Sequence, residues 1–218
     1  MSEPTKEPNE QLITSIFTIL LKNGLKATTM DSVAASLSMS KRTLYEIFES
    51  KKDMILRVVR YWQMQRQKKV ETIFEDSETV MEALVRTFQA HQKMMKEVNI
   101  EFFLDMDKHY PEVRKSFEKY DKLWVNKVMV VINKGIEQGV FRTDVNYPIV
   151  LHLMRIQMES LKRMEEVFPP GITITDAFDS ISIGFLRSIA SPKGMEIIDA
   201  FYSQNHEYIN SPITQIKS

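Results

Sequence analysis

Residues 28–48 read Thr-Thr-Met-Asp-Ser-Val-Ala-Ala-Ser-Leu-Ser-Met-Ser-Lys-Arg-Thr-Leu-Tyr-Glu-Ile-Phe, and this stretch decides the fold of the chain. It contains two short helical patterns separated by the polar run Ser38-Met39-Ser40. The apolar positions of the first pattern recur with the i, i+3, i+4, i+7 spacing of one buried helix face, and they are Met30, Val33, Ala34 and Leu37. Two short helices joined by a tight turn are typical of a helix-turn-helix.

The second pattern predicts a short helix with a basic outer face. Ser40 is a suitable N-cap residue, and Leu44, Ile47 and Phe48 form the apolar side. The outward side carries hydroxyl and cationic groups that suit phosphate oxygens and base edges, namely Lys41, Arg42, Thr43, Tyr45 and Glu46. Helical hairpins with a basic end also occur in proteins that do not bind DNA, so the pattern alone leaves both interpretations open.

Residues 12–60 resemble the N-terminal DNA-binding domain of the TetR family of transcriptional regulators. Members of that family have an apolar helix, a Gly, an Ala-Thr-Thr run, a Val-Ala helix, a Ser-x-x-x-Leu-Tyr-x-x-Phe recognition helix and a Ser-Lys pair that opens the next helix. This chain supplies Ile16, Phe17, Leu20, Gly24, Ala27-Thr28-Thr29, Val33-Ala34, Ser40, Leu44-Tyr45, Phe48 and Ser50-Lys51.

The resemblance implies a set of contacts with double-stranded DNA. By position, Thr29 and Lys51 resemble phosphate contacts. The residues that resemble recognition-helix contacts are Ser40, Lys41, Arg42, Thr43 and Tyr45. Two positions depart from the family pattern, because Arg42 stands where Gly is frequent and Ser38 stands where a turn Gly is common. Arg42 is therefore a candidate for an additional base or phosphate contact.

The charges are unevenly distributed along a chain whose formal net charge is zero. Residues 1–70 carry 12 Lys+Arg against 7 Asp+Glu, whereas residues 71–218 carry 17 against 22. A basic first third suits contact with nucleic acid. The chain has no cysteine, no apolar signal core near its start and no run of about 20 apolar residues, so we expect a cytoplasmic protein without disulfides or membrane contact.

The remaining sequence predicts an all-α protein of about nine to ten helices. The resemblance implies that an N-terminal three-helix helix-turn-helix domain is followed by a helical ligand-binding and dimerisation domain. The expected divisions are a disordered tail at 1–9, the DNA-binding domain at 10–56, the helical body at 57–209 and a C-terminal tail at 210–218. Besides the two short helices, helices are expected at about 10–23, 51–73, 78–96, 99–109, 112–138, 147–167, 175–190 and 193–208.

The resemblance also implies a homodimer that reads a palindromic operator and is released by a small molecule, most often as a repressor. The candidate dimer residues are Leu151, Met154, Leu161, Ile181 and Phe185, although such apolar stripes also occur as ordinary core. The effector is expected to be largely apolar. Its candidate pocket residues are Phe102, Trp124 and Met158, and large apolar side chains line pockets and cores alike.

Two other classes of protein remain open but have weaker support. One is a helical protein–protein adaptor that has lost DNA binding, and the basic second helix argues against it. The other is an enzyme, but the sequence contains no phosphate loop, nucleophile elbow or clustered acid–base pair. Glu101, Asp105 and His109 share one helix side and suit a metal, yet a solvated acidic face is the simpler interpretation. No catalysis, cofactor or metal is therefore expected.

Overall fold

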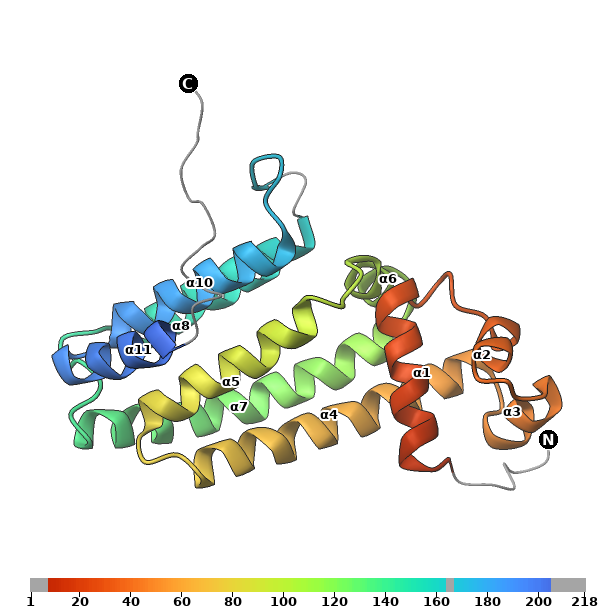
Figure 1. The fold of residues 1–218 in the computed structure, drawn as a ribbon, viewed down its shortest axis with the longest axis horizontal. Coiled ribbons are helices and arrows are strands. Elements are labelled where there is room, and N and C mark those ends of the chain that lie inside the picture. Colours follow the sequence, from red (N-terminus) through yellow and green to blue (C-terminus); the bar gives the residue numbers. More distant parts are fainter. Residues whose placement is uncertain (1–7, 164–166, 205–218) are drawn as a thin grey trace. The chain divides into compact units, whose positions relative to one another are not determined.

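A computed structural model describes residues 8–163 and 167–204, with the backbone alone at 116–127 and 204, and confirms the predicted all-α fold (Figure 1). The elements are α1 (Glu10–Asn23), α2 (Met30–Ser36), α3 (Lys41–Ile47), α4 (Lys51–Glu75), α5 (Val80–Met95), α6 (Glu101–His109), α7 (Pro111–Glu137), α8 (Tyr147–Ser160), the 3-10 turn η1 (Leu161–Arg163), α10 (Ile174–Ile189) and α11 (Pro192–Gln204). Among these described helices, none is long and apolar enough to cross a membrane.

One predicted helix is shorter than expected. The helix predicted at 147–167 ends at Ser160, and the tighter turn η1 follows it. The Ser160 hydroxyl donates a hydrogen bond to the Gln157 carbonyl at 2.6 Å. Hydroxyl groups that bond to nearby carbonyls in this way compete with regular helical hydrogen bonding. The predicted helix end at 205–208 lies outside the described residues.

The chain forms two compact units. Unit 1 contains the residues up to Glu71 together with Lys93–Asn126, and unit 2 contains Thr72–Gln92 and the residues from Lys127 onward. Unit 1 therefore includes α6 and the first part of α7 in addition to the N-terminal helices. The expected domains at 10–56 and 57–209 remain a proposal, and the structural division follows a different line along the chain.

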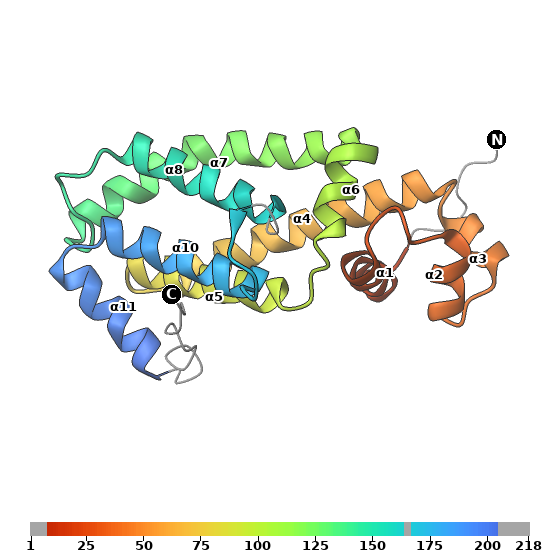
Figure 2. The same cartoon turned by 90° about the horizontal axis from the view of Figure 1, so that it is seen from above.

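The apolar sides of the helix-turn-helix pack into the core of unit 1. Its fully buried side chains include Ile16, Leu20, Leu25, Val33, Leu44, Phe48, Met54, Ile55, Val58 and Val59. Phe17 of α1 stacks on Trp62 of α4 with ring centroids 4.6 Å apart, and it meets Phe102 of α6 edge-on at 6.0 Å. Helices α1, α4 and α6 thus share one aromatic cluster. Figures 1 and 2 show α2 and α3 as neighbouring short helices beside the start of α4.

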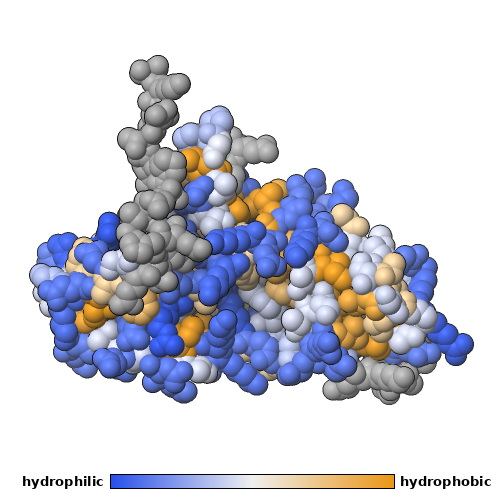
Figure 3. Space-filling model, viewed as in Figure 1, coloured by the Kyte–Doolittle hydropathy of each residue, from blue (hydrophilic) through white to orange (hydrophobic). Residues whose placement is uncertain are grey.

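Unit 2 has a separate core, and α8 packs against α10 within it. Its fully buried residues include Met81, Val85, Val140, Leu186 and Ile198. Gly135 allows the close contact between α7 and the following connector, because a Cβ atom there would lie 2.2 Å from the Phe141 ring. The space-filling view in Figure 3 shows a mainly hydrophilic exterior with separate apolar patches.

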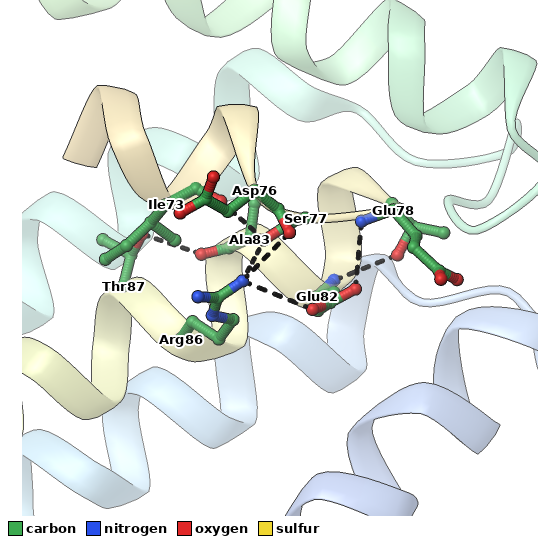
Figure 4. A network of polar contacts seen from close by, with 9 residues as sticks. Ile73, Asp76, Ser77, Glu78, Glu82, Ala83, Arg86 and Thr87 are labelled. Carbon is green, nitrogen blue, oxygen red and sulfur yellow. Dashed lines mark hydrogen bonds and ion pairs between the residues drawn. The ribbon is translucent and has the colours of Figure 1, made fainter. Parts of the chain in front are cut away.

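Arg86 holds the turn between α4 and α5, as Figure 4 shows. Its Nη1 donates hydrogen bonds to the Asp76 carbonyl at 3.3 Å and to Ser77 Oγ at 3.1 Å, and it lies 3.5 Å from Glu82 Oε1. Glu82 also accepts a hydrogen bond from the Glu78 amide at 3.1 Å and so satisfies a free donor near the start of α5. The helix break that the sequence predicts at Asp76-Ser77 is confirmed.

Candidate nucleic-acid interface

Side-chain hydrogen bonds cap both helices of the helix-turn-helix, and the cap that the sequence predicts at Ser40 is present. Thr29 Oγ1 accepts a hydrogen bond from the Ser32 amide at 3.0 Å, and Ser32 Oγ accepts one from the Thr29 amide at 2.9 Å. Ser40 Oγ accepts a hydrogen bond from the Thr43 amide at 3.0 Å. These bonds satisfy backbone donors that the first turn of a helix leaves free. Short-range side-chain chemistry therefore sets where α2 and α3 begin.

The turn between the two helices keeps its geometry without a glycine. Ser38 adopts a φ of +51°, in the left-handed region that favours glycine. The Met39 amide donates to the Ala34 carbonyl at 2.8 Å and the Ser38 amide donates to the Ala35 carbonyl at 3.1 Å. This is the hydrogen-bond pattern that closes many helix C-termini. The substitution of Ser for the usual Gly therefore adds backbone strain but does not change the turn.

Helix α3 has one buried side and one exposed side. Leu44 and Ile47 are buried in the core of unit 1, and the following Phe48 is fully buried. Lys41, Arg42 and Tyr45 are exposed, and Tyr45 is 46% exposed despite its large ring. An exposed aromatic ring beside two cations is suited to contact with bases and phosphates. The sequence-based assignment of the two sides of α3 is confirmed.

Carboxylates pair with both cations at the start of α3. Lys41 Nζ lies 2.7 Å from an oxygen of Asp31 in α2, and this hydrogen bond raises the pKa of the Lys41 ammonium. Arg42 Nε lies 3.2 Å from Glu46 Oε1, while the Arg42 side chain is 90% exposed. Exposed ion pairs of this kind contribute little stability, so a phosphate group can replace either carboxylate at small cost.

The two predicted phosphate contacts have other roles in the free chain. Thr29 caps α2, as described above. Lys51 Nζ donates a hydrogen bond to the Lys26 carbonyl at 2.8 Å. Partial burial lowers the pKa of Lys51, and the nearby Asp105 carboxylate opposes that shift. The Lys51 ammonium has two further protons with which to bind a phosphate oxygen.

The role of Asp105 was not predicted from the sequence. This residue is only 6% exposed, and its Oδ2 accepts a hydrogen bond from the Lys26 amide at 2.6 Å. The prediction of a solvated acidic face is therefore wrong at Asp105, although Glu101 and His109 on the same helix are exposed. A cleft of about 550 Å³ opens beside this contact, lined by Lys26, Glu101, Leu104, Asp105, Asp107, Lys108 and His109. No local pattern in the sequence marks this pairing.

The structure describes the side chains of two of the three predicted pocket residues, and these two belong to different units. Phe102 is 2% exposed in the core of unit 1, where it meets Phe103 edge-on. Met158 is half-buried on α8 of unit 2. The Trp124 side chain lies outside the described residues. Neither Phe102 nor Met158 lines the cleft beside Asp105. Their role in binding an effector remains a proposal.

The predicted dimer residues differ from the exposed apolar row of α8. Leu161 and Phe185 are buried within unit 2, so they add no exposed apolar surface, and Leu151, Met154 and Ile181 are half-buried. The exposed large apolar residues on α8 are instead Ile149, Leu153 and Ile156, with 56%, 52% and 50% exposure. The predicted dimer residues therefore remain a proposal, and the structure adds the exposed apolar residues of α8 as further candidates.

Comparisons with known proteins agree with this geometry. Residues 12–58 match the profile of "Bacterial regulatory proteins, tetR family". The HTH-type transcriptional repressor KstR2 of Mycolicibacterium smegmatis is 24% identical over 162 residues, covering 71% of this chain and 77% of that protein. The structure of the ketosteroid transcriptional regulator KstR2 of Mycobacterium tuberculosis has a TM-score of 0.52 and 20% identity, covering 83% of this chain and 94% of the other. A putative transcriptional regulator from Saccharomonospora viridis, solved in complex with choline, has a TM-score of 0.65 and 16% identity, covering 83% and 96%.

A capped helix-turn-helix with an exposed basic second helix, joined to a helical body, defines the class of DNA-binding transcriptional regulators. Within that class, residues 12–58 match the profile of the TetR family, so the chain carries the DNA-binding domain typical of that family. The family resemblance predicted from the sequence is confirmed.

The strained turn generates a stability prediction. Replacing Ser38 with Gly is expected to stabilise the protein by about 1 kcal/mol. Glycine has no Cβ atom and therefore adopts the left-handed backbone conformation without strain. For a chain of this size the melting temperature rises by roughly 2–4 °C, which thermal denaturation followed by circular dichroism measures. The matched control Ser36→Gly, at the end of α2, is expected to lower it instead. A lower melting temperature for Ser38→Gly contradicts the prediction.

Proposed function

We propose that this chain is a ligand-responsive repressor in the cytoplasm, which binds a palindromic operator as a homodimer and leaves it when a small molecule binds the helical body. The observation that carries the proposal is that α3 buries its apolar side and exposes its basic side. The similar proteins named above are regulators, and we propose no catalytic role and no cofactor.

The DNA-binding step uses residues 40–47. A seven-residue helix is about 10 Å long and covers only a few base pairs in the major groove. Lys41, Arg42 and Tyr45 face the DNA, with Ser40 and Thr43 near the helix start. Thr29 and Lys51 hold the flanking phosphates. Asp31 and Glu46 release their cations when phosphate or base acceptors replace them.

The dimer uses the exposed sides of α8 and α10. Ile149, Leu153 and Ile156 form an exposed apolar row on α8. On α10, Ser180, Gly184 and Ser188 are exposed, and a Cβ atom at Gly184 would meet nothing within 4 Å. Small residues let a second helix approach closely, and an apolar row gains stability when it is covered. These residues support a four-helix contact with the same helices of a second copy.

The effector is proposed to be a largely apolar small molecule, in line with the fold's similarity to a ketosteroid transcriptional regulator. The regulator from Saccharomonospora viridis was solved in complex with choline, so a small cation is the second class of effector to test. Phe102, Trp124 and Met158 remain the proposed pocket residues. An effector weakens DNA binding only if it favours the state with lower DNA affinity, and helix α4 joins the helical body to the DNA-binding helices.

Selection from a pool of randomised duplex DNA tests the proposed function. The purified protein is expected to enrich a two-fold symmetric sequence and to bind that duplex roughly 10³-fold more tightly than a scrambled duplex at the same salt concentration. Fluorescence anisotropy measures both affinities. Equal affinity for the selected and scrambled duplexes contradicts the proposal.

The Arg42→Ala variant tests the recognition helix. The variant is expected to bind the selected duplex about tenfold more weakly, because removal of the guanidinium leaves a base or phosphate acceptor without its hydrogen bond. If Arg42 contacts a phosphate, its loss lowers the slope of log affinity against log salt concentration by about 1. If Arg42 contacts a base, its loss relaxes the sequence preference instead. Lys134→Ala, an exposed cation of α7 in unit 2, is the control and should change neither quantity. Wild-type affinity and wild-type slope for Arg42→Ala reject the contact.

The Leu153→Asp variant tests the dimer. A buried unpaired carboxylate opposes the association of two apolar rows, so the variant is expected to have the mass of one chain by light scattering at concentrations where the wild type has twice that mass. Val130→Asp, on a residue of α7 that is 68% exposed, is the control and should remain dimeric. A wild-type protein with the mass of one chain contradicts this part of the proposal.

A further inference from the structure

Asp105 is a buried carboxylate that the proposed DNA contacts do not explain. It lies on α6 within unit 1 and is 6% exposed. Burying a charged carboxylate is costly unless hydrogen bonds compensate for the lost water. The compensation here comes from a residue 79 positions away, since Asp105 Oδ2 accepts a hydrogen bond from the Lys26 amide at 2.6 Å. Lys26 belongs to the turn between α1 and α2.

The turn also packs closely against the backbone of α6. Gly24 has a φ of +81°, and a Cβ atom there would lie 3.1 Å from Asp105 Oδ2 and 3.1 Å from Glu101 Cβ. Just before α6, the Asn99 amide donates to the Leu21 carbonyl at 2.9 Å, and Asn99 Nδ2 donates to the Lys22 carbonyl at 3.2 Å. The end of α1 and the turn after it are therefore bonded to α6 and its approach at several points.

The same turn positions the proposed phosphate contacts. The Lys26 carbonyl accepts the hydrogen bond from Lys51 Nζ at 2.8 Å, so the backbone of Lys26 is bonded to Asp105 through its amide and to Lys51 through its carbonyl. Thr28 is 1% exposed, and its hydroxyl donates to the Gly24 carbonyl at 2.8 Å. Thr29 follows directly and caps α2.

We propose that Asp105 is a positioning residue, which couples α6 to the DNA-contacting residues Thr29 and Lys51 through the backbone of Lys26. A displacement of α6 that withdraws the carboxylate frees the Lys26 amide, and the turn then no longer holds Thr29 and Lys51 in place for phosphate. This inference rests on the proposed function, and it assigns to Asp105 the hydrogen bond by which α6 holds the turn that carries Thr29.

The Asp105→Ala variant tests the proposal, with the duplex that the wild type selects from the randomised pool as the probe. The variant is expected to bind that duplex about tenfold more weakly, with a salt slope lower by about 1 to 2, because contacts to one or two phosphates are lost. Hydrogen exchange followed by NMR is expected to be faster at the Lys26 amide. Asp107→Ala is the matched control, because Asp107 lies on the same helix and pairs with Arg114.

A purely structural role lowers the stability of the variant but leaves the salt slope of the folded protein unchanged. A folded Asp105→Ala protein with wild-type affinity and slope therefore overturns the proposal. If Asp105→Ala does not fold, the Asp105→Asn variant tests the proposal. The asparagine side chain keeps the shape and one acceptor oxygen, but its hydrogen bond with the Lys26 amide is weaker than that of a carboxylate. It is expected to show faster Lys26 exchange and at least about twofold weaker binding, and wild-type values for both overturn the proposal.

Failure of the proposed function is distinguishable from failure of this inference. If the wild type itself does not prefer the selected duplex, the proposed function fails, whatever the variants do. If the wild type shows that preference and the Asp105 variants match it in affinity, slope and exchange, only the coupling fails.

Discussion

The helix that faces DNA is too short to be stable by itself, and its shape depends on the burial of its apolar side. Isolated helices of fewer than about 12 residues are marginal in water, and α2 and α3 have seven residues each. The core that holds them is built from Leu44, Ile47 and Phe48 together with residues of α1, α4 and α6. The cations of α3 can stay exposed because the apolar side supplies the stability.

Residues far away in the sequence also hold the helix-turn-helix in place. The Arg57 guanidinium donates to the Ile47 carbonyl at the end of α3 at 2.7 Å and lies over the Phe48 ring. Asp105 accepts a hydrogen bond from the Lys26 amide from across unit 1. Hydrogen bonds from α4 and from α6 thus hold the segments on either side of the helix-turn-helix.

Local chemistry explains which parts could be predicted from the sequence. The caps at Thr29 and Ser40 and the buried side of α3 follow from spacing within a few residues, and all are present in the structure. Asp105 could not be predicted in this way, because its partner is 79 positions away and the other acidic residues of α6, Glu101 and Asp107, are exposed. The exposed apolar residues of α8 could not be predicted either, because periodicity alone does not say which side of an apolar helix a neighbouring helix covers.

DNA binding by residues 28–48 through the exposed side of α3 is the central claim. Hydrogen exchange measured with the selected duplex and with a scrambled duplex tests this claim most directly. We expect slower exchange at Met30–Ser36 and Lys41–Ile47 with the selected duplex alone, while α8, α10 and α11 exchange at the same rate with both. Protection elsewhere in the chain without protection in α3, or equal protection by both duplexes, would contradict the claim.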